Sequence, residues 1–347
     1  MARNEQLIEI IIPNWNGKRF LQDCLDSLRH QSSRNFSVTV VDNGSTDGSV
    51  ALLETDYPEI NLLRFPDNRG FSAAVNLGIE RATAPWILLL NNDMEIDRDC
   101  LSSLERGIEQ YPEYDFFALK MRSFHQRDVL DGAGDGVLRG GVGYRLGTME
   151  HDGPPYDTDK DVFGACAGAA LYRRDMFSRV GLFDNDFFAY LEDVDLNMRA
   201  RRAGLRCRFL ATAVVYHIGS ATSGSKINPL TIRLSTRNNL NVLIKNYPIS
   251  LLIRFFPVIF LYQAAWLVFA LKKKMGLPYL HGLVQFLGQM PQMLARRRIA
   301  GDGLISPRDF GELLSQGERD AVSSIMARRD SEGKNNLLLK IYWKLFL

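Results

Sequence analysis

The sequence Ile87-Leu88-Leu89-Leu90-Asn91-Asn92-Asp93 contains an uninterrupted apolar run that ends in three polar residues. Consecutive branched aliphatic residues without polar alternation are typical of a strand buried on both faces, as in a parallel sheet covered by helices. Three similar runs precede it, and helical periods separate them. The runs are Ile8–Pro13, Ser37–Val41 and Ile60–Phe65, and the helical segments are Phe20–His30, Ser49–Thr55 and Ser72–Arg81. This alternation predicts an α/β fold with a Rossmann-like, mostly parallel sheet flanked by helices.

Each of these four strands is followed by a polar loop. The loops are Pro13-Asn14-Trp15-Asn16-Gly17, Asp42-Asn43-Gly44-Ser45-Thr46-Asp47-Gly48, Pro66-Asp67-Asn68-Arg69-Gly70-Phe71 and Asn91-Asn92-Asp93. The carboxyl ends of parallel strands meet at one edge of the sheet, where such sheets bind ligands. There Asp42 can accept hydrogen bonds from a base or a ribose, and Asp93 can hold a divalent metal against a diphosphate. One such turn is ordinary, but four at the same edge indicate a binding site.

Several other functional classes lack support in the sequence. No G-x-G-x-x-G or G-x-x-x-x-G-K-[ST] pattern follows the first strand, which excludes a dinucleotide oxidoreductase and a P-loop enzyme. A formal net charge of +2 argues against a nucleic-acid-binding protein. The sequence contains four scattered cysteines and no CxxC pair: Cys24, Cys100, Cys166 and Cys207. We therefore expect neither a disulfide framework nor a zinc site, and we expect the protein to reside in a reducing cytosol. Residues 1–12 do not have the length or flanks of a secretory segment.

Four motifs carry a resemblance to a known family. They are Ile-Ile-Pro-Asn-Trp-Asn-Gly (11–17), Val-Val-Asp-Asn-Gly-Ser-Thr-Asp-Gly-Ser (40–49), Asn-Arg-Gly-Phe-Ser-Ala-Ala-Val-Asn-Leu-Gly (68–78) and Leu-Leu-Asn-Asn-Asp (89–93). Together they resemble the inverting glycosyltransferases of family 2, which have the GT-A fold. Within that family the chain is similar to bacterial rhamnosyltransferases that build lipid-linked polysaccharide precursors. The resemblance covers roughly residues 7–220.

The resemblance implies a nucleotide-sugar donor bound at the sheet edge. The implied donor-binding residues are Pro13, Asn14, Asn16, Asp42, Asn43, Asn68, Gly70, Phe71, Asn76, Asn92 and Gly168. Asp93 corresponds to the last acid of the metal-binding DxD element, whose first position is Asn91 here, so one metal carboxylate is missing. With His217, which ends a predicted strand, Asp93 is expected to bind Mg²⁺ or Mn²⁺.

The aromatic run Phe187-Phe188-Ala189-Tyr190-Leu191 leads into Glu192-Asp193-Val194-Asp195 at the start of a predicted helix. Acids at a helix start also occur for capping alone. Inverting transfer requires a carboxylate that takes the proton of the acceptor hydroxyl. Following the resemblance, we expect Asp193 to be this base and Glu192 to hold sugar hydroxyls, although the two roles can be exchanged. Asp195 is expected to cap the helix or form a structural pair.

The sequence divides into two expected parts. Residues 1–225 form the nucleotide-sugar-binding and catalytic domain, in which the glycine-rich loops of residues 121–162 face the acceptor and include Asp135. Residues 226–347 form a helical region rich in basic and aromatic residues. At the junction, the loop of residues 220–225 is expected to close over the diphosphate, and Arg237 to act as a cation for the leaving group.

Two apolar segments in this second part, Phe255–Leu271 and Tyr279–Leu294, are flanked by Lys272-Lys273-Lys274 and Arg296-Arg297-Arg298. Their lengths are borderline for crossing a bilayer. Basic flanks favour helices that lie in the plane of an anionic membrane surface. A buried helical pair in a homodimer is the alternative.

These patterns together predict a membrane-associated enzyme of cell-envelope polysaccharide synthesis. It would move rhamnose from dTDP-rhamnose to a hydroxyl of a lipid-linked saccharide at the cytoplasmic face of the membrane. A UDP- or GDP-linked donor is one alternative, and a catalytically silent scaffold that binds a nucleotide sugar is another. A sugar nucleotidyltransferase would be expected to have a basic, glycine-rich loop where this chain has Asn14-Trp15-Asn16.

Overall fold

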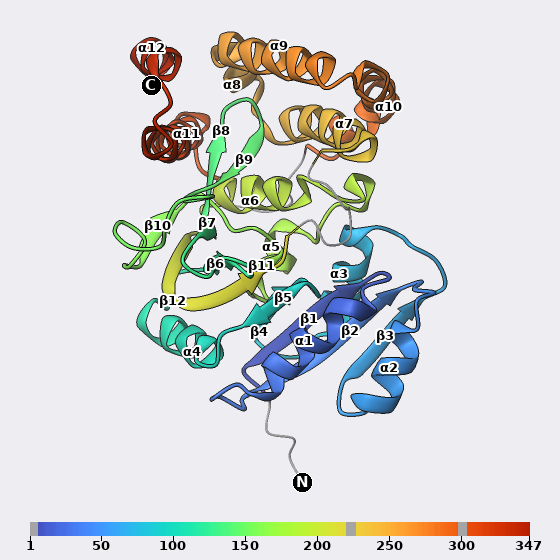
Figure 1. The fold of residues 1–347 in the computed structure, drawn as a ribbon. Coiled ribbons are helices and arrows are strands. Elements are labelled where there is room, and N and C mark those ends of the chain that lie inside the picture. Colours follow the sequence, from blue (N-terminus) through green and yellow to red (C-terminus); the bar gives the residue numbers. More distant parts are fainter. Residues whose placement is uncertain (1–5, 220–226, 298–303) are drawn as a thin grey trace.

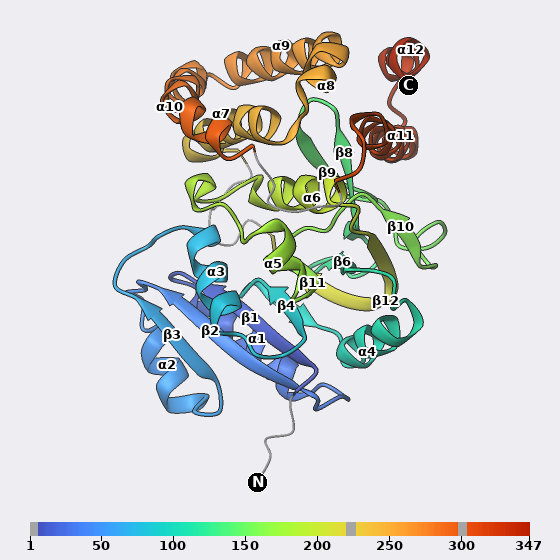
Figure 2. The same cartoon turned by 180° about the vertical axis from the view of Figure 1, so that it is seen from behind.

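The computed structural model describes residues 6–219, 227–297 and 304–347, so the predicted loop of residues 220–225 and the boundary at residue 225 lie outside it. The chain builds one large sheet, covered by helices, with further helices at the end of the molecule away from the N-terminus (Figures 1 and 2). The strand order in the sheet is β10-β12-β6-β11-β4-β1-β2-β3, with β5 beside β12 and β7 beside β6.

The first half of the sheet is parallel, as predicted. Its strands are β1 (Ile8–Asn14), β2 (Phe36–Asn43), β3 (Asn61–Phe65) and β4 (Trp86–Leu90). In the register of β1 and β2, Asn14 lies opposite Asp42. The polar loops therefore begin at the same edge of the sheet, where the sequence predicted a binding site.

The second half is mixed, so the prediction of a mostly parallel sheet is wrong there. Its strands are β5 (Met94–Ile96), β6 (Phe116–Ser123), β7 (Leu130–Ala133), β10 (Lys160–Val162), β11 (Ala169–Arg173) and β12 (Cys207–His217). Strand β11 runs antiparallel between β4 and β6, which reverses the direction in the middle of the sheet. Strand β12, which ends at His217 as predicted, pairs with β6 in parallel and has an irregularity between Leu210 and Val214.

Helices cover both faces of the sheet. On one face lie α1 (Lys18–Arg29), α2 (Ser49–Asp56) and α4 (Cys100–Gln110), and on the other α3 (Phe71–Arg81), α5 (Met176–Val180) and α6 (Glu192–Arg202). Successive strand residues point to opposite faces. Ile10 and Ile12 accordingly pack with α1, whereas Ile11 packs with α3. The continuous apolar runs thus contribute side chains to two hydrophobic cores, one on each face of the sheet.

The C-terminal helices pack beyond α6. They are α7 (Pro229–Asn246), α8 (Ile249–Arg254), α9 (Phe256–Lys272), α10 (Gly276–Ala295), α11 (Pro307–Ser331) and α12 (Leu337–Phe346). Helix α7 packs between α6 and α10, and α11 packs on the hairpin of β8 (Asp135–Leu138) and β9 (Val142–Arg145). Among the described helices, none has both the length and the apolar character needed to cross a bilayer.

Candidate active site

A chain of side-chain hydrogen bonds joins the ends of β1, β2 and β4. The Asn92 amide donates to Asn14 Oδ1 at 2.7 Å, and the Asn14 amide donates to Asp42 Oδ1 at 3.0 Å. The second carboxylate oxygen of Asp42 accepts from the backbone N–H of Ser45 at 3.0 Å. Three strand ends that are distant in sequence are thereby fixed to one another. We call the loops at these strand ends the polar rim.

The rest of the polar rim is held in the same manner. The Asn43 amide donates to Asn68 Oδ1 at 3.1 Å and to the Gly70 carbonyl at 3.0 Å. Gly70 has a φ of 87°, which a side chain rarely adopts, and a Cβ there would lie 2.5 Å from the Phe188 carbonyl oxygen. Phe71 donates its N–H to that same oxygen at 2.6 Å. The rim therefore touches the turn that carries the acidic pair.

Glu192 and Asp193 occupy the first turn of α6, next to this rim. The Ala167 N–H donates to Asp193 Oδ2 at 3.3 Å, while the Asn91 N–H donates to the Gly168 carbonyl at 2.8 Å. The segment around Gly168 thus connects the end of β4 to the acids. Glu192 is 7% exposed, and its Oε2 atom has no hydrogen-bond partner among the described residues.

The pKa values of the two acids are shifted by different surroundings. Burial and the neighbouring Asp193 raise the pKa of Glu192 to about 8. Burial also raises the pKa of Asp193, but the N–H groups of Val194 and Ala167 and the charge of Arg145 act against that rise. At neutral pH Glu192 therefore holds a proton, whereas Asp193 accepts hydrogen bonds that favour its charged form.

A second group of charged side chains lies at the end of β12. His217 directs Nδ1 to Asp131 Oδ2 at 2.7 Å, and its Nε2 lies 3.5 Å from Asp93 Oδ2. The same Asp131 oxygen pairs with Arg145. Burial lowers the pKa of His217, but hydrogen bonds to Asp131 and Asp93 outweigh it and raise the pKa to about 9.

The sequence profile described as Glycosyl transferase family 2 matches residues 9–181. Through these residues the chain belongs to glycosyltransferase family 2. The matched segment contains the whole polar rim and Gly168. The acidic pair and His217 lie beyond it, on α6 and β12.

Curated relatives of this family 2 chain include two mycobacterial proteins. N-acetylglucosaminyl-diphospho-decaprenol L-rhamnosyltransferase of Mycobacterium tuberculosis is 27% identical over 240 residues, which are 63% of this chain and 78% of that protein. PGL/p-HBAD biosynthesis glycosyltransferase of Mycobacterium bovis is 26% identical over 257 residues, 70% of this chain and 91% of that protein. The resemblance to rhamnosyltransferases is therefore confirmed.

Solved structures with the same fold include GalNAc-T7 with UDP, GalNAc and Mn²⁺, with a TM-score of 0.57 and 13% identity over 70% of this chain and 48% of that one. This family 2 chain thus spans about half of that protein. Residues 1–349 of S. aureus TarS in complex with UDP-GlcNAc superpose with a TM-score of 0.54 and 17% identity, over 94% of this chain and 92% of that one. These similarities establish a GT-A-like fold.

The predicted metal ligands Asp93 and His217 do lie together. The bond from Nδ1 to Asp131 fixes the direction of the His217 ring, a common support for metal-binding histidines. With a pKa of about 9 the ring also carries a proton on Nε2 at neutral pH, and a metal bound there would displace that proton. The donor set of one carboxylate and one imidazole therefore fits Mg²⁺ or Mn²⁺ that also takes ligands from its substrate. Within the described part of the family 2 chain, no group of three His, Cys, Asp or Glu side chains is arranged for a metal.

Three predicted residues make contacts within the protein. The Asn76 amide donates to the Phe183 carbonyl at 2.7 Å, and its oxygen accepts from the Phe183 N–H at 3.0 Å. Arg237 donates to the Phe187 carbonyl at 2.7 Å. Their donor-binding roles stay predictions. Asp195 accepts from Lys245 at 2.8 Å, so its predicted structural pairing is what the structure contains.

The sequence did not predict that Asp131 and Arg145 would lie beside His217. They lie on β7 and β9, in the glycine-rich stretch that was predicted as acceptor-side loops. Asp135 in the same stretch is buried, its Oδ1 has no partner among the described residues, and burial together with Asp193 raises its pKa to about 7. Asp131 and Asp135 lie on two different strands, β7 and β8, which Gly134 separates with a φ of 80°. No strand period therefore links the two acids in the sequence.

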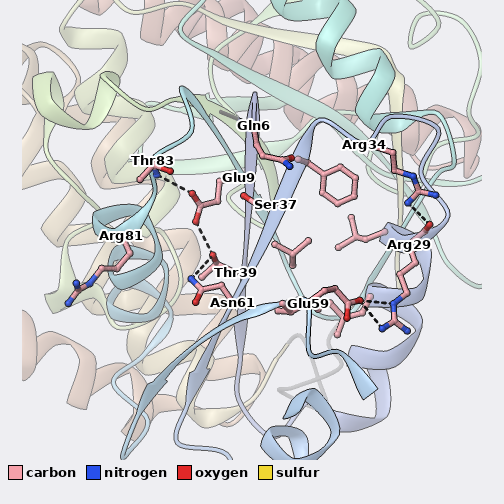
Figure 3. A pocket seen from close by; sticks show the side chains of 15 residues that line it. Gln6, Glu9, Arg29, Arg34, Ser37, Thr39, Glu59, Asn61, Arg81 and Thr83 are labelled. Atoms are coloured by element: carbon pink, nitrogen blue, oxygen red, sulfur yellow. Dashed lines mark hydrogen bonds and ion pairs between the residues drawn. The ribbon is translucent and has the colours of Figure 1, made fainter. Parts of the chain in front are cut away.

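A cavity of about 840 Å³ lies at the amino ends of β1 and β2, away from the polar rim (Figure 3). Figure 3 marks two hydrogen bonds to Glu9, which accepts from Thr39 Oγ1 at 2.9 Å and from the Thr83 N–H at 3.1 Å. Glu9 therefore joins β1 to β2 and to the loop before β4. Ligands of parallel sheets bind at the opposite edge, so this cavity is not the candidate site.

Proposed function

We propose that this chain is an inverting glycosyltransferase that moves rhamnose from dTDP-rhamnose to a hydroxyl of a lipid-linked saccharide. The observation that carries the proposal is the acidic pair Glu192-Asp193, held beside the polar rim of a family 2 domain with raised pKa values. The relative named as a decaprenol-linked L-rhamnosyltransferase supports the sugar and the lipid-linked acceptor. Together they point to cell-envelope polysaccharide synthesis.

In this proposal Asp193 takes the proton of the acceptor hydroxyl as its oxygen attacks the anomeric carbon. The bond between that carbon and the diphosphate oxygen breaks, the nucleoside diphosphate leaves, and the configuration inverts. Glu192, protonated at neutral pH, donates a hydrogen bond to a sugar hydroxyl. Asp42 and Asn14 at the rim would hold the nucleoside.

Asp93 and His217 would hold a divalent cation, whose charge would stabilise the departing diphosphate as a Lewis acid. Asp131 contributes by directing His217, since its carboxylate holds Nδ1 at 2.7 Å. A calorimetric comparison of dTDP-, UDP- and GDP-sugars, each with and without Mn²⁺, would identify the donor. Preferential binding of a UDP- or GDP-sugar would overturn the dTDP assignment.

Two isosteric variants test the base. Asp193→Asn removes basicity and should lower the transfer rate by roughly 10²- to 10⁴-fold while donor affinity persists. Glu192→Gln imitates the protonated acid and should retain most turnover, so it is the matched control. Measured kcat values that fall in the reverse order would assign the base to Glu192 instead, and normal turnover of both variants would remove the pair from the chemistry.

We also propose that the C-terminal helices rest on the cytoplasmic surface of the membrane. Large apolar side chains are exposed on α8, α9, α10 and α12; examples are Ile253, Phe256, Phe260, Leu277 and Leu338. These helices gather at one end of the molecule in both views (Figures 1 and 2). From Leu196 to Gly301 the sequence contains no Asp or Glu. An apolar face flanked by cations and free of acids suits an anionic bilayer surface.

A further inference from the structure

The turn that precedes the acidic pair has a strained backbone. Phe188, Tyr190 and Leu191 have φ values of 64°, 70° and 65°, although none is glycine. The Ala189 N–H donates to the Phe187 carbonyl at 2.8 Å and closes a γ-turn around Phe188, which has a ψ of −63°. This form of γ-turn is rare and strained. Such a backbone persists only where surrounding contacts hold it.

Helix α7 supplies most of these contacts through one asparagine. The Asn238 amide nitrogen lies 3.0 Å from the Phe187 carbonyl oxygen, 3.0 Å from that of Ala189 and 2.7 Å from that of Tyr190. Asn238 is completely buried, and its Oδ1 accepts from Arg237 Nε at 2.8 Å. One side chain thus binds three carbonyl groups of a five-residue turn.

The polar rim holds the carbonyl group of Phe188, which Asn238 does not bind. Phe188 O accepts the Phe71 N–H at 2.6 Å, at the start of α3. The turn is therefore fixed between the polar rim and α7. The acids follow directly after Leu191, so the conformation of the turn decides where their carboxyl groups lie.

Helix α7 itself is fixed against α6. Lys245 donates to Asp195 at 2.8 Å and to Asp184 at 2.7 Å, and the Asn246 amide donates to Asp195 at 2.9 Å. These buried contacts lie two helical turns beyond Asn238. Helix α7 thus has a set position from which Asn238 reaches the turn.

We infer that Asn238 is a positioning residue that holds Glu192 and Asp193 in their reactive orientation by binding the carbonyl groups of Phe187, Ala189 and Tyr190. The inference rests on the proposed role of the acidic pair. It extends that role, because part of the C-terminal helical region then belongs to the catalytic apparatus. Asn238 acts through the backbone and does not touch the substrate.

The test is Asn238→Ala in the full-length protein. We expect kcat to fall by about 10²-fold, because small misplacements of reacting groups have effects of that size. The Kd of the donor, measured by calorimetry, should stay near that of the wild type because the hydrogen bonds that join Asn14, Asp42 and Asn92 do not involve Asn238. Asn241→Ala is the matched control. Asn241 is an equally buried asparagine of α7 that donates to Gln289 of α10 at 2.8 Å, and its loss should leave kcat unchanged.

Hydrogen–deuterium exchange gives a readout that does not depend on activity. In Asn238→Ala, the amides of residues 187–195 should exchange faster than in the wild type and in Asn241→Ala, with no change in the loops that follow β1 and β2. Asn238→Ser retains one donor and should be intermediate in both kcat and exchange, which provides a test if the alanine variant does not fold.

Comparison with Asp193→Asn separates the two proposals. An Asn238→Ala or Asn238→Ser protein with wild-type kcat and wild-type exchange would overturn the positioning role, while an inactive Asp193→Asn would keep the base assignment. A fully active Asp193→Asn would instead overturn the proposed function.

Discussion

The polar rim and the acidic pair lie side by side but are stabilised in different ways. The rim is held by hydrogen bonds between side chains of its own short loops, as in the contacts of Asn14 with Asn92 and of Asn43 with Asn68. The acids depend on a strained turn, on α7 and on buried charges. A binding surface can thus be built from ordinary turns, whereas the reactive carboxyl groups require support from a distant segment. Asn238 lies 51 residues from the Phe187 carbonyl that it binds.

Helix α6 repeats this contrast within a few residues. Burial raises the pKa of both Glu192 and Asp195, but Arg199 and Lys245 outweigh it for Asp195 and lower its pKa to about 2. Glu192 has no such cation and its pKa rises to about 8. The neighbouring cations therefore keep Asp195 ionised within a structural network, whereas Glu192, without such cations, carries a proton at neutral pH.

The largest expected effect comes from breaking the support of α7. Lys245→Met keeps the aliphatic chain but leaves Asp184 and Asp195 without their shared ammonium group, from which they lie 2.7 and 2.8 Å. Removing one partner of a buried ion pair costs about 3–5 kcal/mol. Denaturation in guanidinium chloride should report a loss of this size in the free energy of unfolding.

Two further variants allow the stability loss of Lys245→Met to be compared with losses elsewhere in the molecule. Lys272→Met removes an exposed lysine and should change the free energy of unfolding by less than about 0.5 kcal/mol. Asn68→Ala removes a rim amide and should cost about 1 kcal/mol, with a weaker donor Kd. Equal losses from Asn68→Ala and Lys245→Met would remove the distinction between the two regions.

The rim was predictable from sequence because each polar loop directly follows an apolar strand. Asp42, Asn68 and Asn92 lie where that local pattern put them, although their donor contacts stay predictions. The parallel pairing of β1 to β4 follows from the same runs. The direction of β11 was not predictable, since its apolar run Ala169–Tyr172 fits either orientation between β4 and β6.

The surroundings of the acidic pair were harder to predict, because residues distant in sequence provide them. On α7, Asn238 and Lys245 have the appearance of a solvated helix face in sequence, yet both are buried. Arg296 and Arg297 were predicted as membrane flanks. In the structure Arg296 pairs with Asp184 and Asp186, and Arg297 donates to the Ile244 and Tyr247 carbonyls. Arg298 lies outside the described residues.

The outer face of the C-terminal helices gives the next prediction. Replacing Lys272, Lys273 and Lys274 by serine should weaken binding to phosphatidylserine vesicles by about 10²-fold, since each lysine near an anionic surface contributes about 1 kcal/mol. Sedimentation with vesicles measures it. The matched control replaces Arg34, Arg81 and Arg98, three exposed cations of the sheet domain, by serine. Equal losses in both variants would mean that net charge, not this face, binds the lipid.

The last prediction concerns Glu192 and the pH dependence of stability. Its pKa is about 8 in the folded protein and near the ordinary value of 4.5 in the unfolded chain. Between these values the folded protein keeps a proton that the unfolded chain has released. The contribution of this group to stability is therefore fully present below pH 4.5 and is lost as the pH rises through about 8.

Glu192→Gln cannot ionise, so its Tm relative to the wild type should increase as the pH rises from about 5 to about 9. Asp195→Asn should behave differently, because a pKa of about 2 leaves Asp195 ionised over that whole range. Its Tm deficit should be large and independent of pH. Differential scanning fluorimetry of both variants measures the two slopes. Parallel pH dependences would mean that the two carboxyl groups of α6 have the same environment, against the separation of catalytic and structural acids on which the proposed function depends.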